Sequence, residues 1–284
     1  MHINIEDIKI SNKEITLLNK KPFPYFCWDN FLPEKIYNEL YNSWPSDDYY
    51  DVSTYGGKQG FQKNQKDKVN IFFDKNEKWK KLISLFDSQN FIDDVEKFIK
   101  PLQYNHRPIV ASRKWKLKNR ISSFKDKIFS SEVAIDWELS RYNKNNFLDP
   151  HTDRMTKYVS LLLYFPDPNW KDEYGGGTIM YKPKNKLYNK NWSNNYIPLE
   201  YMNIINNFTY KKNRLVGFIK TANSWHGVEP IRQPEGMWRR ALAINIGLPE
   251  SKYLDLSNRI IESFYRRIES PKFNHINVHK NIKF

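Results

Sequence analysis

Two short segments carry the residues best suited to chemistry. The first contains His151 and Asp153, and the second, much later in the chain, contains His226. Two imidazoles and one carboxylate form the 2-His-1-carboxylate facial triad, which binds non-haem Fe(II) on one face and leaves the opposite face open for oxygen chemistry. The sequence therefore predicts an iron site at these three residues, and an oxidising enzyme as its consequence.

The spacing of these residues is compatible with one shared ion. A single residue separates His151 from Asp153, and on a strand the side chains of residues i and i+2 point to the same face. His226 must then come from a different strand, and the apolar run 215–219 leads directly to it. Either segment alone is weak evidence, because a lone histidine is more often structural than a ligand. Zinc is the chemical alternative, since the same three side chains can bind it.

Composition indicates a globular protein with a substantial core. The 284 residues are 39% hydrophobic and 16% aromatic, and aromatic side chains bury a large area each. The single cysteine, Cys27, excludes an internal disulfide framework and fits a reducing compartment. The N-terminus lacks a signal-peptide pattern and the longest apolar run, 158–165, is too short to cross a bilayer. We therefore expect a cytoplasmic protein that does not enter the membrane.

The net charge of +14 has two interpretations. One is an anionic partner, such as a nucleic acid, a nucleotide-linked substrate or an acidic protein. The other, which we favour, is a genomic bias towards lysine and asparagine codons, because no nucleic-acid-binding motif accompanies the lysines. An anionic substrate stays open, whereas a nucleic-acid partner is disfavoured.

Periodicity predicts helices followed by many short strands. We expect a helix at 33–40, one or two helices within 76–100, a further helix at 251–270, a loop at 46–70 and a polar excursion at 182–208. The basic segment 104–130 is expected to be an exposed strand or loop. Strands are expected at 22–28, 133–142, 158–165, 178–181, 214–219 and 239–248. This order favours a mainly β protein with flanking helices (α+β), built on a barrel or sandwich core.

Several motifs, taken in order, resemble a known family. They are Pro150-His151-Thr152-Asp153, the run 158–167, Gly175-Gly176-Gly177-Thr178, His226-Gly227-Val228 and the run 239–245. This combination resembles the Fe(II)- and 2-oxoglutarate-dependent dioxygenases, in their prolyl 4-hydroxylase-like branch. The resemblance covers most of residues 22–250. It is specific to the superfamily and much less specific about the substrate.

The resemblance implies a fold, a set of cofactors and a reaction. The fold is a double-stranded β-helix, or jelly-roll core. The implied cofactor is Fe(II), the implied cosubstrates are 2-oxoglutarate and O2, and a role for ascorbate is left open. The usual outcome is hydroxylation of an unactivated C–H bond. On this basis we expect a single domain over 1–284, with a buttress of helices and strands at about 1–130, the catalytic jelly-roll core at about 131–250, and a C-terminal helix and basic tail at about 251–284.

The distal carboxylate of 2-oxoglutarate requires a buried cation, and arginine offers a matching bidentate fork. Arg239 and Arg240 are both candidates, and on a strand they face opposite ways. Arg239 shares its face with Ala241, Ala243 and Asn245, which leave room for a ligand, so we favour Arg239 over Arg240. By the resemblance, Tyr142 and Tyr164 supply cosubstrate-binding hydroxyls. Ser160 and Leu162 share the face of Tyr164 by a period of two and are expected to line the same pocket.

The substrate is the least constrained part of the prediction. On family grounds the first hypothesis is a prolyl residue in a peptide or protein, with a small metabolite, either an amino acid or a sugar-nucleotide, as the alternative. A catalytically silent jelly-roll binding module is disfavoured by the intact ligand set. Nucleic-acid demethylation or hydroxylation is permitted by the charge, but no aromatic-basic motif for base flipping accompanies it. The oligomeric state is not predicted.

Overall fold

The computed structural model describes residue 5 and residues 8–51, 58–102, 109–111, 131–153, 157–189, 191 and 196–247. The helix predicted at 251–270, the basic tail and most of the basic segment 104–130 lie outside these residues. Among the described residues, no helix is long and apolar enough to span a membrane.

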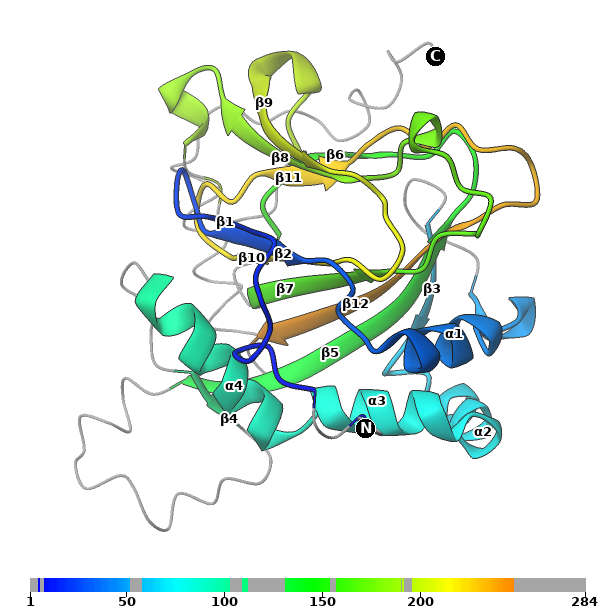
Figure 1. The fold of residues 1–284 in the computed structure, drawn as a ribbon. Coiled ribbons are helices and arrows are strands. Elements are labelled where there is room, and N and C mark those ends of the chain that lie inside the picture. Colours follow the sequence, from blue (N-terminus) through cyan, green and yellow to red (C-terminus); the bar gives the residue numbers. More distant parts are fainter. Residues whose placement is uncertain are drawn as a thin grey trace, which may run out of the picture.

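Two sheets face each other, as Figure 1 shows, with the smaller sheet lying above the larger one. The smaller sheet has the order β6 (Leu148–His151), β11 (His226–Val228), β8 (Thr178–Pro183) and β9 (Met202–Phe208). The larger sheet has the order β1 (Leu17–Asn19), β2 (Tyr25–Trp28), β10 (Leu215–Ile219), β7 (Lys157–Tyr164), β12 (Arg239–Gly247), β5 (Ser131–Tyr142) and β3 (Lys58–Gln62). An eighth strand, β4 (Ile109–Ala111), pairs in parallel with β5. The mainly β class and the jelly-roll core are as predicted.

Four helices cover the face of the larger sheet that points away from the smaller one (Figure 1). They are α1 (Glu34–Asn42), α2 (Lys66–Lys75), α3 (Glu77–Phe86) and α4 (Gln89–Ile99), so the predicted helix at 33–40 and the predicted helices within 76–100 are confirmed. The main hydrophobic core lies between these helices and the sheet, and it includes Trp79, Trp137 and Phe165.

The alternation of β5 separates this core from the space between the sheets. Ile135, Trp137 and Leu139 are buried in the helix-facing core. Asp136 and Glu138 lie between them in sequence and line the cavity on the other face, because successive strand side chains point to opposite faces. One strand therefore builds the core and the wall of a cavity at once.

Two predictions of irregular structure were wrong. The segment 46–70 contains β3 and the start of α2, and the segment 182–208 contains β9. Both strands are polar, and their stability comes from pairing: β3 pairs with β5, and β9 pairs with β8. Such pairing joins residues far apart in sequence, so local composition does not reveal it.

Candidate metal and cosubstrate site

The three predicted ligands converge at one end of the smaller sheet. His151 is the last residue of β6 and His226 is the first residue of β11, and the two are directly paired across these strands. Asp153 lies two residues beyond β6. Candidate ligand atoms of the three buried residues lie within 4.8 Å of one another. Segments distant in sequence thus place two imidazoles and one carboxylate around a common point.

The backbone at Asp153 differs from the strand geometry that we expected. The strand β6 ends at His151, and Asp153 has a φ of 65°, in the left-handed region that few non-glycine residues adopt. The chain therefore turns after His151. The carboxylate reaches the imidazoles because of this turn and not because of strand alternation.

Both imidazoles present the same nitrogen to this point. His151 Nδ1 is 2.9 Å from the carbonyl oxygen of Asp149, and His226 Nδ1 is 2.9 Å from the carbonyl oxygen of Ser224. A carbonyl oxygen can only accept a hydrogen bond, so each Nδ1 carries the proton and each Nε2 keeps a free lone pair. The Nε2 atoms of His151 and His226 lie 3.8 Å and 3.6 Å from the carboxylate oxygens of Asp153. Fixing the tautomer in this way is typical of metal-binding histidines.

The site keeps the charge states that a metal requires. Burial lowers the pKa of His151 to about 3, and burial likewise lowers the pKa of His226. Burial on its own would raise the pKa of Asp153, but nearby Lys157 and the two imidazoles hold it well below its usual range. At neutral pH the site therefore offers two neutral imidazoles and one carboxylate, which fits the binding of a divalent cation.

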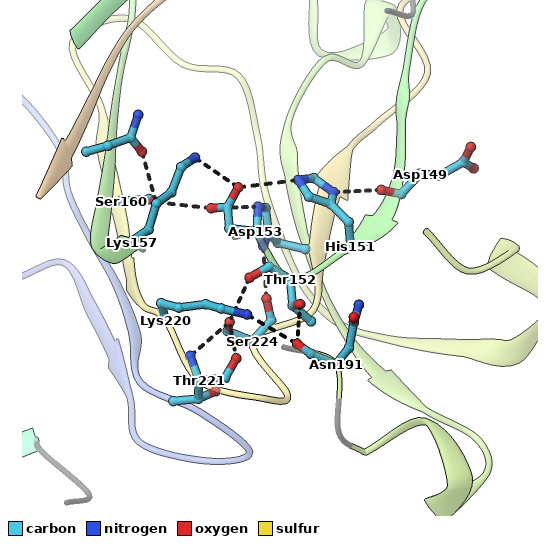
Figure 2. A network of polar contacts seen from close by, with 12 residues as sticks. Asp149, His151, Thr152, Asp153, Lys157, Ser160, Asn191, Lys220, Thr221 and Ser224 are labelled. Atoms are coloured by element: carbon cyan, nitrogen blue, oxygen red, sulfur yellow. Dashed lines mark hydrogen bonds and ion pairs between the residues drawn. The ribbon is translucent and has the colours of Figure 1, made fainter. Parts of the chain in front are cut away.

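Two further side chains hold the Asp153 carboxylate (Figure 2). Lys157 Nζ donates to Oδ1 at 2.9 Å, and Ser160 Oγ lies 3.2 Å from Oδ2. Ser160 Oγ also lies 3.1 Å from the Oδ1 atom of Asn245. Below the ligands, the carbonyl of Asn191 accepts hydrogen bonds from Thr152 Oγ1 and Lys220 Nζ, which ties down the turn between His151 and Asp153.

The ligands open onto a cavity of about 810 Å³ between the two sheets. Its inner part is lined by the predicted Tyr142, Ser160, Leu162 and Arg239, together with Thr178. Its outer part is lined by further polar residues, of which the sequence pattern had placed only Asn245 on this face. These are Asp51, Lys58, Gln62, Asn64, Gln65, Asp136, Glu138, Lys157, Tyr196 and Asn245.

Arg239 is the buried cation of the inner cavity. It is 2% exposed, its Nε donates to the carbonyl of Gly176 at 2.7 Å, and its Nη2 has no hydrogen-bond partner among the residues that the structure describes. Its guanidinium carbon lies 5.3 Å from the ring centroids of Tyr142 and Tyr164. A buried guanidinium with a donor left over requires an acceptor, and the distal carboxylate of a bound keto acid is one.

The other predicted cosubstrate residues divide between lining and supporting positions. Tyr142, Ser160 and Leu162 line the cavity itself. Tyr164 is fully buried beside it, and its hydroxyl is hydrogen-bonded to Thr178 Oγ1. Arg240 is directed to the opposite face of β12, where its guanidinium lies over the rings of Tyr41 and Trp44.

The charged outer residues could have been found by extending the period of two. On β5, Asp136 and Glu138 share a face with Tyr142, and on β12, Asn245 shares a face with Arg239. Lys58 forms an ion pair with Glu138. Lys157 could not have been assigned in this way, because its partner, Asp153, lies outside the strands and strand alternation does not place it.

Comparison with known proteins agrees with this geometry. Residues 137–247 match the family model described as the 2OG-Fe(II) oxygenase superfamily. This segment contains both histidines, the aspartate and both candidate arginines. No curated protein sequence matches the chain.

Solved structures with a similar outline include a prolyl-4-hydroxylase from Pseudomonas putida, at 13% identity, a TM-score of 0.43, and coverage of 79% of this chain and 92% of the other. A prolyl hydroxylase from Trichoplax adhaerens, in complex with a fragment of hypoxia inducible factor, has 14% identity, a TM-score of 0.40, and coverage of 84% and 86%. HygX from Streptomyces hygroscopicus, with nickel and 2-oxoglutarate bound, has 10% identity, a TM-score of 0.42, and coverage of 79% and 82%. At these values the similarities carry no argument about the substrate.

The segment 137–247 matches the 2OG-Fe(II) oxygenase superfamily, as its motifs predicted. This match supports a 2-oxoglutarate-dependent dioxygenase that uses Fe(II), and the triad residues provide a donor set suited to that ion.

Proposed function

We propose that His151, Asp153 and His226 bind the Fe(II) and that Arg239 binds the distal carboxylate of 2-oxoglutarate. One observation carries the proposal: the cavity that the three ligands line also contains a buried arginine with an unsatisfied donor. A hydrolytic zinc site has no need of such a group. When bound, the metal and the keto acid supply oxidative decarboxylation coupled to hydroxylation of a C–H bond.

The protein residues contribute position and charge. His151 and His226 present Nε2 lone pairs whose direction is fixed by their Nδ1–H bonds to carbonyl groups. The hydrogen bond from Arg239 Nε to the carbonyl of Gly176 holds the guanidinium in place. Its Nη2 can therefore donate to an anion with little reordering of the side chain. Tyr142 lines the same cavity, with its ring centroid 5.3 Å from the guanidinium carbon of Arg239.

We further propose that the hydroxylated substrate is a small metabolite that carries both charges, such as a free amino acid. The outer wall of the cavity contains a basic side chain, Lys157, and an acidic one, Asp136. Burial and nearby Glu138 raise the pKa of Asp136, and Lys157 offsets part of this rise. An internal prolyl residue carries no charge and would form an ion pair with neither group. A zwitterion supplies a partner to each of them.

A substrate panel tests this proposal. The panel contains free amino acids, the same amino acids blocked at the amine or the carboxylate, prolyl peptides and sugar-nucleotides, with O2, Fe(II) and 2-oxoglutarate. Incorporation of one oxygen atom is measured by mass spectrometry, and succinate is measured alongside. We expect free amino acids to be oxidised and blocked forms to fail. Oxidation of prolyl peptides in preference to free amino acids would contradict the proposal.

Matched variants separate the two charges. Lys157→Met should impair substrates that carry a carboxylate, and Asp136→Asn should impair substrates that carry an amine. Because Lys157 also contacts Asp153, metal affinity is measured for both variants. Succinate that never forms, with or without substrate, would instead indicate a silent binding module, and oxidation of DNA or RNA would indicate a nucleic-acid enzyme.

A further inference from the structure

The carboxylate of Asp153 has two neighbours of different character. Lys157 is 30% exposed at its side chain and reaches Oδ1 from the rim of the cavity. Ser160 is buried on β7 and contacts Oδ2. A long side chain at the rim can leave when a metal arrives, because the cations repel each other. A buried hydroxyl on a strand in the middle of a sheet stays in place, so Ser160 is the lasting partner of the carboxylate.

The hydroxyl of Ser160 lies against two acceptor oxygens but has only one proton to donate. Its Oγ contacts two oxygens, Oδ2 of Asp153 and Oδ1 of Asn245. A serine hydroxyl has a single proton, so it cannot donate to both. Rotating the Asn245 amide by half a turn exchanges oxygen for nitrogen with no change of shape. Nδ2 then donates to Ser160 Oγ, and the serine proton is left for Asp153.

We infer that Asn245 is a positioning residue for the metal site. It donates to Ser160, and Ser160 in turn donates to Asp153, which fixes the plane of the ligand carboxylate. The strand register builds this relay, because Asn245 and Ser160 are directly paired between β12 and β7. The inference rests on the proposed metal ligands and extends them to a residue that does not itself reach the metal.

The relay explains why an amide stands at position 245. An aspartate there could only accept from Ser160, so it would withdraw the serine proton from Asp153 and place a second negative charge nearby. A leucine has a similar volume and no polar atom, so it would leave Ser160 free to rotate. Of these three side chains, only the amide can donate to Ser160, leave the serine proton for Asp153 and add no charge.

The test measures Co²⁺ binding by the intact protein without 2-oxoglutarate, so that no turnover is involved. The variants are Asn245→Asp, Asn245→Leu, Ser160→Ala and the double variant Ser160→Ala/Asn245→Leu, and the visible spectrum of bound Co²⁺ reports ligand geometry. We expect roughly 10-fold weaker binding in each single variant, as is usual when a partner of a metal ligand is lost. The double variant should be no weaker than Ser160→Ala alone.

Controls separate the relay from the fold and from the metal site. Asn203→Asp makes the same chemical change on an exposed residue of β9 and should leave Co²⁺ affinity unchanged. Asp153→Ala should abolish binding. If Asn245→Asp or Asn245→Leu binds Co²⁺ as tightly as the natural protein while Asp153→Ala does not bind, the relay is refuted and the site stands. If the two single losses multiply in the double variant, Asn245 acts independently of Ser160 and the relay is also refuted. If Asp153→Ala binds normally, the metal site itself is wrong.

Should Asn245→Asp fail to fold, Ser160→Ala and Asn245→Leu still decide the question. A purely structural role for Asn245 would lower the melting temperature and leave both the affinity and the spectrum of bound Co²⁺ unchanged. That result overturns the inference.

Discussion

Arg239 and Arg240 are neighbours in sequence and lie on opposite faces of β12. Arg239 is directed into the cavity between the sheets, where one of its nitrogens has no hydrogen-bond partner within the described part of the chain. Arg240 lies over Tyr41 and Trp44 on the helix-covered face. Substituting each arginine in turn therefore tests which of the two binds the cosubstrate.

Arg239→Met should weaken 2-oxoglutarate binding roughly 10- to 100-fold, because a charge-assisted hydrogen bond contributes about 1.5–3 kcal/mol. Arg240→Met is the matched control. It should lower the melting temperature through lost stacking and leave the dissociation constant within about twofold. Calorimetric titration of 2-oxoglutarate into the metal-loaded protein measures both, and the opposite ranking would exchange the roles of the two residues.

The buried histidines predict how stability depends on pH. The folded pKa of His151 is about 3, below its usual value of 6.5. The unfolded chain therefore binds more protons between these values, so the free energy of unfolding of the metal-free protein should fall as pH drops below about 6.5. Urea unfolding at a series of pH values from 7 to 4 measures this free energy.

His151→Gln is the control for this pH dependence. It should flatten the slope, and subtraction of the two curves removes the contribution of groups such as Asp149, whose burial raises its pKa to about 6. Parallel curves for the two proteins would show that His151 titrates normally in the fold.

Gly227 follows the ligand His226 in a place where no side chain fits. A Cβ atom there would lie 2.4 Å from the carbonyl oxygen of Leu148, which is backbone of the paired strand β6. Gly227→Ala should therefore push β11 from β6, lower the stability by about 1–3 kcal/mol and weaken metal binding by separating the two histidines.

Gly60→Ala is the comparison for Gly227→Ala. A Cβ atom at Gly60 meets mainly the flexible end of Glu138, so its effect on metal binding should be small. Thermal melting and Co²⁺ titration of both variants test this contrast. Equal metal affinity in the two variants would mean that the spacing of β6 and β11 does not set the site.

The residue types explain how much could be predicted from the sequence. A period of two on β12 was enough to favour Arg239 over Arg240, because strand alternation is local, whereas Tyr142 was assigned from the family resemblance. The triad could be proposed because two histidines and one aspartate in this spacing, followed by an arginine on a predicted strand, form a specific combination. Asn245 was placed on the face of Arg239, but its contact with Ser160 was missed because that contact depends on the pairing of β7 with β12. Lys157 was missed because its partner, Asp153, lies outside the strands. The strand β3 was missed because it is polar and depends on β5 as its partner.

The substrate proposal depends on two charged residues whose proximity no local pattern reveals. Asp136 and Lys157 reach one cavity from different strands, and only the assembled sheet brings them together. The sequence motifs predict the metal chemistry, whereas the residues of the outer cavity wall determine substrate specificity.

Anaerobic titration of Fe(II) into the metal-free protein tests the central claim most directly, with Asp153→Ala as the comparison. The account predicts one tightly bound ion per chain in the natural protein, and loss of that binding when the carboxylate is removed. An affinity for Fe(II) that is the same in both proteins would contradict it.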